Sequence, residues 1–285
     1  MERVLVVGSV NPELVFRYRS GGTKVRADSY TIQLGGTAYN VAARLSALLN
    51  PVDVLFEALV GQDVMGSAVH ERIGGIAHEM LWWRPVTAVA CILLPEGGLH
   101  QTIGFKQAAA SSRSRVAQLD RIMTREHPQI VLAAGLIPGE EWIAQTLFTG
   151  VRPSKLRVLC PDVLACANGT LDAVLAHTDL LVMNEEEARV FFRADSSELR
   201  EEVIRARVVC NVIVTRAEHG AVFFERGSSP VEVATERVDV RNPVGAGDTF
   251  LAALLAEVAR GVSPGVALRA AVAAGTRHVA AVASA

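Results

Sequence analysis

Short apolar runs typical of strands alternate with longer segments of helical periodicity along most of this sequence, and this alternation limits the possible folds more than any other feature. Core strands are expected at residues 4–7, 54–60, 130–134, 156–160, 180–183 and 212–215. Helices are expected at residues 41–49, 186–192 and 249–260. Strands that alternate with helices form parallel sheets covered on both faces. The sequence therefore predicts an α/β fold with a mostly parallel buried sheet.

Two stretches do not follow this alternation. Residues 13–34 and residues 88–105 contain alternating segments and turn signals that indicate β-hairpins. We expect both to project from the main sheet as a small accessory layer. With 285 residues and no linker rich in serine, proline or charge, residues 1–285 are expected to form a single domain.

The charge balance argues against a polyanionic partner, because 28 Lys and Arg against 30 Asp and Glu give a net charge of -2. Nucleic-acid binding is therefore not expected. No apolar stretch stays free of charge, Gly or Pro for the roughly 20 residues that a spanning helix needs, so no membrane association is expected. The sequence begins without a secretory apolar region, and its four cysteines form no Cys-x-x-Cys pair. These features predict a cytoplasmic protein.

The strongest local signal is the segment from Asn242 to Phe250, which reads Asn-Pro-Val-Gly-Ala-Gly-Asp-Thr-Phe and runs into an amphipathic helix. Two glycines around a small residue allow backbone N–H groups to converge at a helix start, where the helix dipole favours an anion. A carboxylate at that point would repel a bound phosphate, so Asp248 is better explained as a base beside it. The alternative is that Asp248 only caps its helix.

Three further segments place polar residues beside a glycine or at a helix start. Gly35 and Gly36 precede a helix that carries Asn40, whose amide can bind hydroxyl groups, although a tight turn is the alternative. Residues 184–187 read Asn-Glu-Glu-Glu, which is also ordinary for a helix N-terminus. Residues 215–221 join two apolar strands, either as a nucleotide-binding loop or as a plain hairpin turn.

In their order along the chain, these segments resemble the ribokinase-like carbohydrate kinases, also called the PfkB family. The resemblance rests on residues 6–11 (VVGSVN), 35–36 (GG), 60–66 (VGQDVMG), 184–187 (NEEE) and 245–248 (GAGD), and it covers nearly the whole chain. It implies a ribokinase-like three-layer α/β/α core, in which residues 13–34 and 88–105 form a β-lid over the acceptor. An exposed edge of that lid would allow a homodimer.

The resemblance also implies a role for each matching residue. Asp248 would take a proton from a hydroxymethyl group of the acceptor. The transferred γ-phosphoryl group would be stabilised by the backbone amides of Gly245, Ala246, Gly247 and Asp248. Mg²⁺ would be organised, chiefly through water, by Asn184 and Glu187. ATP would be bound by Asn184, Thr215, Arg216 and Gly220, and the acceptor by Asn11, Glu13, Gly35, Gly36 and Asn40.

Three features depart from the family pattern. Glu13 stands where the acceptor-binding carboxylate is usually Asp, which predicts an altered sugar pocket. Asn242 stands where an Asp often helps to bind a monovalent cation, so the sequence does not support stimulation by potassium. The sequence stops at Ala285, before the family's usual closing segment, which predicts a more open nucleotide pocket.

From the resemblance we expect an ATP-dependent, Mg²⁺-requiring kinase that phosphorylates a primary hydroxyl of a small sugar or sugar-like alcohol. A nucleoside kinase of the same fold is one alternative, which an aromatic residue such as Tyr39 or Phe105 stacked on a base would favour. A catalytically weak sugar- or nucleotide-binding protein is the other. A Walker A loop is excluded, because no lysine follows a glycine.

Overall fold

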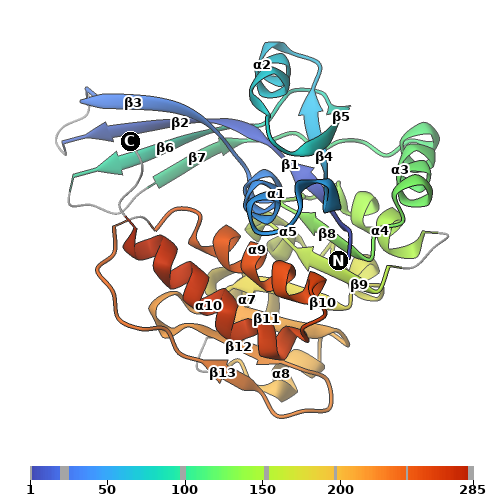
Figure 1. The fold of residues 1–285 in the computed structure, drawn as a ribbon, viewed down its shortest axis with the longest axis vertical. Helices are drawn as coiled ribbons and strands as arrows, with labels where there is room; N and C mark the ends of the chain where they lie inside the picture. The colour runs from blue at the N-terminus through green and yellow to red at the C-terminus, as the bar shows by residue number, and fades with distance from the viewer. Residues whose placement is uncertain are drawn as a thin grey trace.

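The computed structural model describes residues 2–19, 26–96, 101–150, 154–195, 198–241 and 243–281. Within these residues the strands form two sheets, one of nine strands and one of four (Figure 1). Asn242, on which the expectation about potassium depends, lies outside the described residues.

The large sheet carries the main core. Its strands, in spatial order, are β13 (Val231–Val233), β12 (Ala221–Phe224), β11 (Asn211–Thr215), β10 (Leu180–Asn184), β9 (Leu156–Cys160), β8 (Ile130–Ala134), β1 (Val4–Ser9), β4 (Val54–Gly61) and β5 (Ala77–Arg84). The strands from β11 to β5 pair in parallel, whereas β12 and β13 are antiparallel. The carboxyl ends of the parallel strands therefore meet at one edge, where ligands bind in open α/β sheets.

Helices cover both faces of the large sheet. One face carries α1 (Thr37–Leu48), α2 (Val64–Arg72), α9 (Ala246–Ala259) and α10 (Pro264–Ala280), and near them lies the 3₁₀ turn η1 (Pro51–Asp53). The other face carries α3 (Arg113–Glu126), α4 (Glu141–Thr149), α5 (Val163–Asn168), α6 (Asp172–Leu175), α7 (Glu185–Phe192) and α8 (Glu201–Arg205). Successive residues of β1 show both layers, because Val4 and Val6 pack on the first face and Leu5 and Val7 on the second. The three-layer α/β/α fold with a mostly parallel sheet is thus confirmed.

The small sheet projects from the large one (Figure 1). Its order is β3 (Ser29–Gly35), β2 (Asn11–Tyr18), β6 (Val89–Pro95) and β7 (Gln101–Phe105). β2 pairs antiparallel with β3, β6 pairs antiparallel with β7, and β2 and β6 join the two pairs in parallel. These pairs coincide closely with the two stretches in which the sequence predicts hairpins. Because β2 starts two residues after β1 ends, the small sheet is tied directly to the centre of the large one.

The sequence prediction lacks β5 and β13, the two strands at the edges of the large sheet. β5 lies at an edge of the large sheet, its first half carries the polar residues His78 and Glu79 and is only partly buried, and its apolar run is confined to residues 80–83. Trp83, near its end, is buried in the core. Among the described helices, none is both long and apolar enough to cross a membrane.

Candidate active site

Helix α9 begins at a glycine turn on the face that also carries α1 and α10. Gly245 is the N-cap residue, with a φ of 82° in the left-handed region, and no side chain caps the helix. The first N–H groups of a helix have no partner within it. A Cβ added at Gly247 would meet nothing within 4 Å, so the first turn opens onto free space. The start of α9 can therefore receive an anion on its backbone amides.

Asp248 lies in the first turn of α9, and its carboxylate is held from the side by α1. Its Oδ2 accepts a hydrogen bond of 2.7 Å from Asn40 Nδ2. Because Gly245 occupies the N-cap position, the alternative in which Asp248 caps the helix is not what the structure shows. Burial raises the pKa of Asp248, and the nearby Glu13 adds to this rise, whereas the Asn40 hydrogen bond, Arg44 and His278 oppose it.

The residues expected to bind the acceptor surround the turn that leads into α1. Gly36 has a φ of 99°, and a Cβ there would lie 2.7 Å from the Ser9 carbonyl oxygen and 2.8 Å from Asn11 Oδ1. A Cβ at Gly35 would overlap the Glu13 carboxylate, which also accepts a bond of 3.1 Å from Gln33 Nε2. Gly36 is therefore required by its φ and by the Ser9 backbone, whereas a side chain at Gly35 would displace the Glu13 carboxylate. The structure brings Asn11, Glu13, Gly35, Gly36 and Asn40 together beside Asp248.

Two basic side chains at this turn were missed by sequence reasoning. Arg44 Nε donates to Thr249 Oγ1 at 2.8 Å, and His278 Nε2 lies 2.8 Å from the Val244 carbonyl oxygen. Arg44 follows Asn40 by four residues, a spacing that puts both on one face of a helix and could have identified it. No comparable local signal points to His278, which comes from α10.

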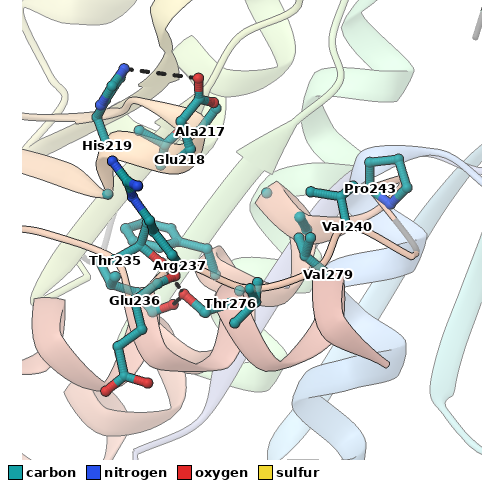
Figure 2. Close-up of a pocket in the computed structure, with 18 residues that line it drawn as sticks. Ala217, Glu218, His219, Thr235, Glu236, Arg237, Val240, Pro243, Thr276 and Val279 are labelled. Carbon is teal, nitrogen blue, oxygen red and sulfur yellow. Dashed lines mark hydrogen bonds and ion pairs between the residues drawn. The ribbon is translucent and has the colours of Figure 1, made fainter. Parts of the chain in front are cut away.

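A cavity of about 760 Å³ lies beside the start of α9, between the loop that joins β11 to β12 and helix α10 (Figure 2). Figure 2 labels Ala217, Glu218 and His219 on one side and Thr276 and Val279 on the other. Its remaining lining residues are Thr215, Gly220, Thr235, Glu236, Arg237, Val238, Val240, Pro243, Ala246, Gly247, Phe250, Val272 and Gly275. Because Ala246 and Gly247 also start α9, the cavity and the anion-binding turn are continuous.

The loop from β11 to β12 is built as a hairpin around a 3₁₀ turn, η2 (Ala217–His219). Thr215 and Gly220 line the cavity. Gly220 has a φ of 86°, and a Cβ there would overlap the Val233 carbonyl oxygen. Arg216 is not among the lining residues, and its Nη1 lies 3.5 Å from Glu232 Oε1. Of the residues expected to bind the nucleotide, Thr215 and Gly220 therefore lie at the cavity, whereas Arg216 lies against β13.

Asn184 and Glu187 lie at the start of α7, where they cap the helix reciprocally. Asn184 Oδ1 accepts from the Glu187 N–H at 2.9 Å, and Glu187 Oε2 accepts from the Asn184 N–H at 2.8 Å. The pKa of Glu187 is raised to about 7, chiefly by burial and also by Asp162, Glu186 and Asp248, whereas the hydrogen bond from the Asn184 N–H lowers it. Neither residue is among those that line the cavity.

These two residues fit a Mg²⁺ ion that would take its other ligands from water and phosphate oxygens. In the described part of the chain, no three His, Cys, Asp or Glu side chains gather into a ready metal cage. Mg²⁺ at phosphate-transferring sites commonly keeps waters and uses one or two carboxylates plus phosphate oxygens. The mostly buried carboxylate of Glu187, near three other carboxylates, is a negative site of this kind.

Comparison with known proteins identifies the family. The family model described as pfkB family carbohydrate kinase matches residues 1–283. The chain belongs to this family. The pfkB match covers nearly all of the sequence and confirms the resemblance and the carbohydrate-kinase class that the sequence predicts.

Individual relatives agree with the pfkB assignment. The bifunctional protein HldE of Rhodopseudomonas palustris (strain TIE-1) is 39% identical over 256 residues, which cover 84% of this chain and 51% of that protein. The chain therefore spans about half the length of its HldE relative. The ribokinase of Bacillus subtilis is 27% identical over 279 residues, covering 94% of this chain and 90% of that protein.

A solved structure is similar over almost the whole pfkB chain. The Arabidopsis thaliana ribokinase, complexed with ribose and ATP, superposes with a TM-score of 0.74 at 20% identity, covering 98% of this chain and 92% of that one. At this identity the likeness establishes the fold. It places the present large and small sheets in the architecture of ribokinases.

Proposed function

We propose that this pfkB-family protein is an ATP-dependent kinase that transfers the γ-phosphoryl group to a primary hydroxyl of a small sugar or sugar-like acceptor. One observation carries the proposal: Asp248 stands at the start of α9, bonded to Asn40 on the acceptor side, while Ala246 and Gly247 of the same turn line the large cavity. A carboxylate and the first backbone amides of α9 thus lie together where two substrates would meet.

In this proposal Asp248 is the general base. Asn40 holds Oδ2 of the carboxylate, and we assign the acceptor hydroxyl to the other oxygen. Proton removal by a positioned base contributes typically about 10² to 10⁴ in rate. The amides of Gly245, Ala246, Gly247 and Asp248 stabilise the negative charge on the transferred group, as an oxyanion hole does. Phosphoryl transfer depends chiefly on such positioning and charge stabilisation.

We assign the cavity to ATP. Its volume of about 760 Å³ falls within the usual range for ligand pockets. Its apolar lining, which includes Val238, Val240 and Val279, suits a flat base, and Thr215 adds a polar side chain to the lining. ATP is present in the cytoplasm, and we propose that the protein acts there.

We assign Mg²⁺ to the start of α7, where Glu187 and Asn184 would hold the ion directly or through water. When bound, the ion neutralises charge on the phosphates. We propose no monovalent-cation requirement, because Asn242 offers no carboxylate to such an ion.

The acceptor side is proposed to be closed by the small sheet acting as a lid, so that residues 1–285 work as one unit. β2 and β3 deliver Asn11, Glu13 and Gly35 to the site. Closure would exclude water and limit ATP hydrolysis. The same sheet exposes apolar side chains on β3 and β7, including Tyr30 at 65% and Ile103 at 64%. Exposed apolar surface of this kind supports a homodimer through the lid.

An assay of ADP release tests the proposal. The protein is incubated with ATP and Mg²⁺ and with panels of free sugars, sugar alcohols, sugar phosphates and nucleosides. We expect ADP release to require a sugar-like acceptor. Release only with nucleosides would replace the proposal by a nucleoside kinase. Thermal stabilisation by ligands without ADP release would replace it by a weak binding protein.

A further inference from the structure

Arg44 joins helix α1 to helix α9 at the point where Asp248 and the glycine turn meet. Its Nε donates to Thr249 Oγ1 at 2.8 Å, and its Nη1 donates to the Asn40 carbonyl oxygen at 3.2 Å. Thr249 Oγ1 in turn donates to the Gly245 carbonyl oxygen at 2.9 Å. One guanidinium therefore ties the helix that bears Asn40 to the turn that bears the proposed anion site.

The same guanidinium fills the space beside Gly245. A Cβ at Gly245 would lie 2.8 Å from Arg44 Nη2 and 3.6 Å from His278 Nε2. Arg44 from α1 and His278 from α10 thus flank the turn. Because Gly245 has no side chain, the guanidinium of Arg44 can lie directly against its backbone.

We propose that Arg44 is a positioning residue for the phosphoryl transfer assigned above: it fixes the turn at Gly245 and holds a permanent positive charge where α1 meets the start of α9, the turn that bears Asp248. This inference rests on the proposed function of Asp248 as the base. Arg44 acts through Asp248 and the turn, and no contact with substrate is assigned to it.

The charges around Asp248 explain why such a residue is needed. Glu13 from β2 disfavours the carboxylate, and Glu187 from α7 and Cys160 from β9 also interact electrostatically with it. Arg44 and His278 favour the ionised form. An imidazole is charged only when it is protonated, whereas a guanidinium is charged at every working pH. Arg44 is therefore the constant counter-charge at this site.

The carboxyl titration of Asp248 tests the inference without any acceptor. Protein labelled with ¹³C at the aspartate carboxyl carbons is titrated by NMR, and the Asp248 signal is identified as the one missing in Asp248→Asn. We expect Arg44→Gln to raise the midpoint of this titration by about half a unit or more, because a nearby opposite charge lowers a carboxyl pKa. We expect Arg44→Lys, which keeps the charge, to restore most of the shift.

Arg260 provides a matched control. It lies at the far end of α9, and its Nη2 donates to the Leu48 carbonyl oxygen of α1 at 2.6 Å, so it bridges the same two helices away from Asp248. Arg260→Gln should leave the Asp248 titration unchanged. The inference is overturned if Arg44→Gln also leaves it unchanged, or if Arg44→Lys shifts it as far as Arg44→Gln does.

The two proposals fail in different ways. An unchanged titration in Arg44→Gln would remove Arg44 from the account and leave Asp248 as the base. Near-normal turnover by Asp248→Asn would remove the base, whatever the titration shows. If Arg44→Gln unfolds, Arg44→Lys and Arg44→Met at reduced temperature provide the same comparison of charged and uncharged side chains.

Discussion

Two carboxyl groups of this protein, Asp248 and Glu57, both have a pKa raised by burial, yet their surroundings are opposite. Asp248 accepts a hydrogen bond from Asn40 and faces Arg44 and His278. Glu57, in the middle of β4, is 2% exposed, and its Oε2 has no hydrogen-bond partner among the described residues. Glu79 and Glu126 raise the pKa of Glu57 further, and only Arg125 lowers it, so that it reaches about 8.

Under the proposed function, this difference in surroundings distinguishes the general base Asp248 from Glu57, a carboxyl group with no matching donor. A base must be ionised and must face a place where a substrate can lie. Asp248 has a donor, positive charges and an adjoining cavity. Glu57 lies in the sheet, on the face covered by α3, and its neighbouring carboxylates disfavour its charge. Burial alone therefore does not identify a functional carboxyl group here.

The largest expected effect comes from exchanging each acid for its amide in turn. With an acceptor found in the ADP-release panel, Asp248→Asn should lower kcat by about 10² to 10⁴. Glu57→Gln should leave kcat close to that of the unchanged protein, because Glu57 touches no part of the site. Steady-state assays of the two variants measure this contrast. A comparable loss of kcat in both variants would show that the surroundings of Asp248 and Glu57 do not distinguish a functional carboxyl group from a structural one.

A third buried acid, Glu140, sharpens the comparison because it is fully paired. Arg84 donates to both Glu140 oxygens at 2.8 Å, and both side chains are completely buried. Arg84→Met should destabilise the fold by about 3–5 kcal/mol, since it leaves a buried charge uncompensated. The matched control is Arg157→Met, which breaks a similar but partly exposed pair with Asp179 and should cost about 1 kcal/mol or less. Urea unfolding measures both, and equal losses would contradict the burial argument.

Glu57 makes a contribution that depends on pH. Its pKa rises from an ordinary value of 4.5 to about 8 in the folded protein, so the folded state holds a proton that the unfolded state releases. Stability should therefore fall as the pH rises between these values, by at most roughly 1.4 kcal/mol per pH unit. Urea unfolding across this range should show a weaker decline in Glu57→Gln. A decline of the same slope in the variant would exclude Glu57 as its cause.

The smallest expected effect concerns potassium. Because Asn242 carries no charge, replacing potassium with a large organic cation at constant ionic strength should leave turnover unchanged within error. Asn242→Asp then provides the converse test, since the new carboxylate is expected to create a response. Strong activation of the unchanged protein by potassium would contradict this expectation.

The sequence predicted the parts of the molecule that depend on continuous local patterns. The apolar runs located β1, β4 and β8 to β11, and the glycine turns located the starts of α1 and α9. The edge strands β5 and β13 were missed because polar residues fill the first half of β5 and β13 has only three residues. His278 was missed because its contact joins segments more than 30 residues apart, and no local pattern reports such a contact. Arg44 was missed although its spacing of four residues from Asn40 could have identified it, because its bond to Thr249 comes from a distant helix.

The most direct test of the central claim compares nucleotide binding with phosphoryl transfer in Asp248→Asn. A non-hydrolysable ATP analogue is titrated by calorimetry, and transfer of a labelled γ-phosphoryl group to the acceptor is followed in a single turnover. The account predicts an almost unchanged Kd together with a transfer rate lower by about 10² or more. Transfer at a rate close to that of the unchanged protein would contradict the assignment of Asp248 as the base.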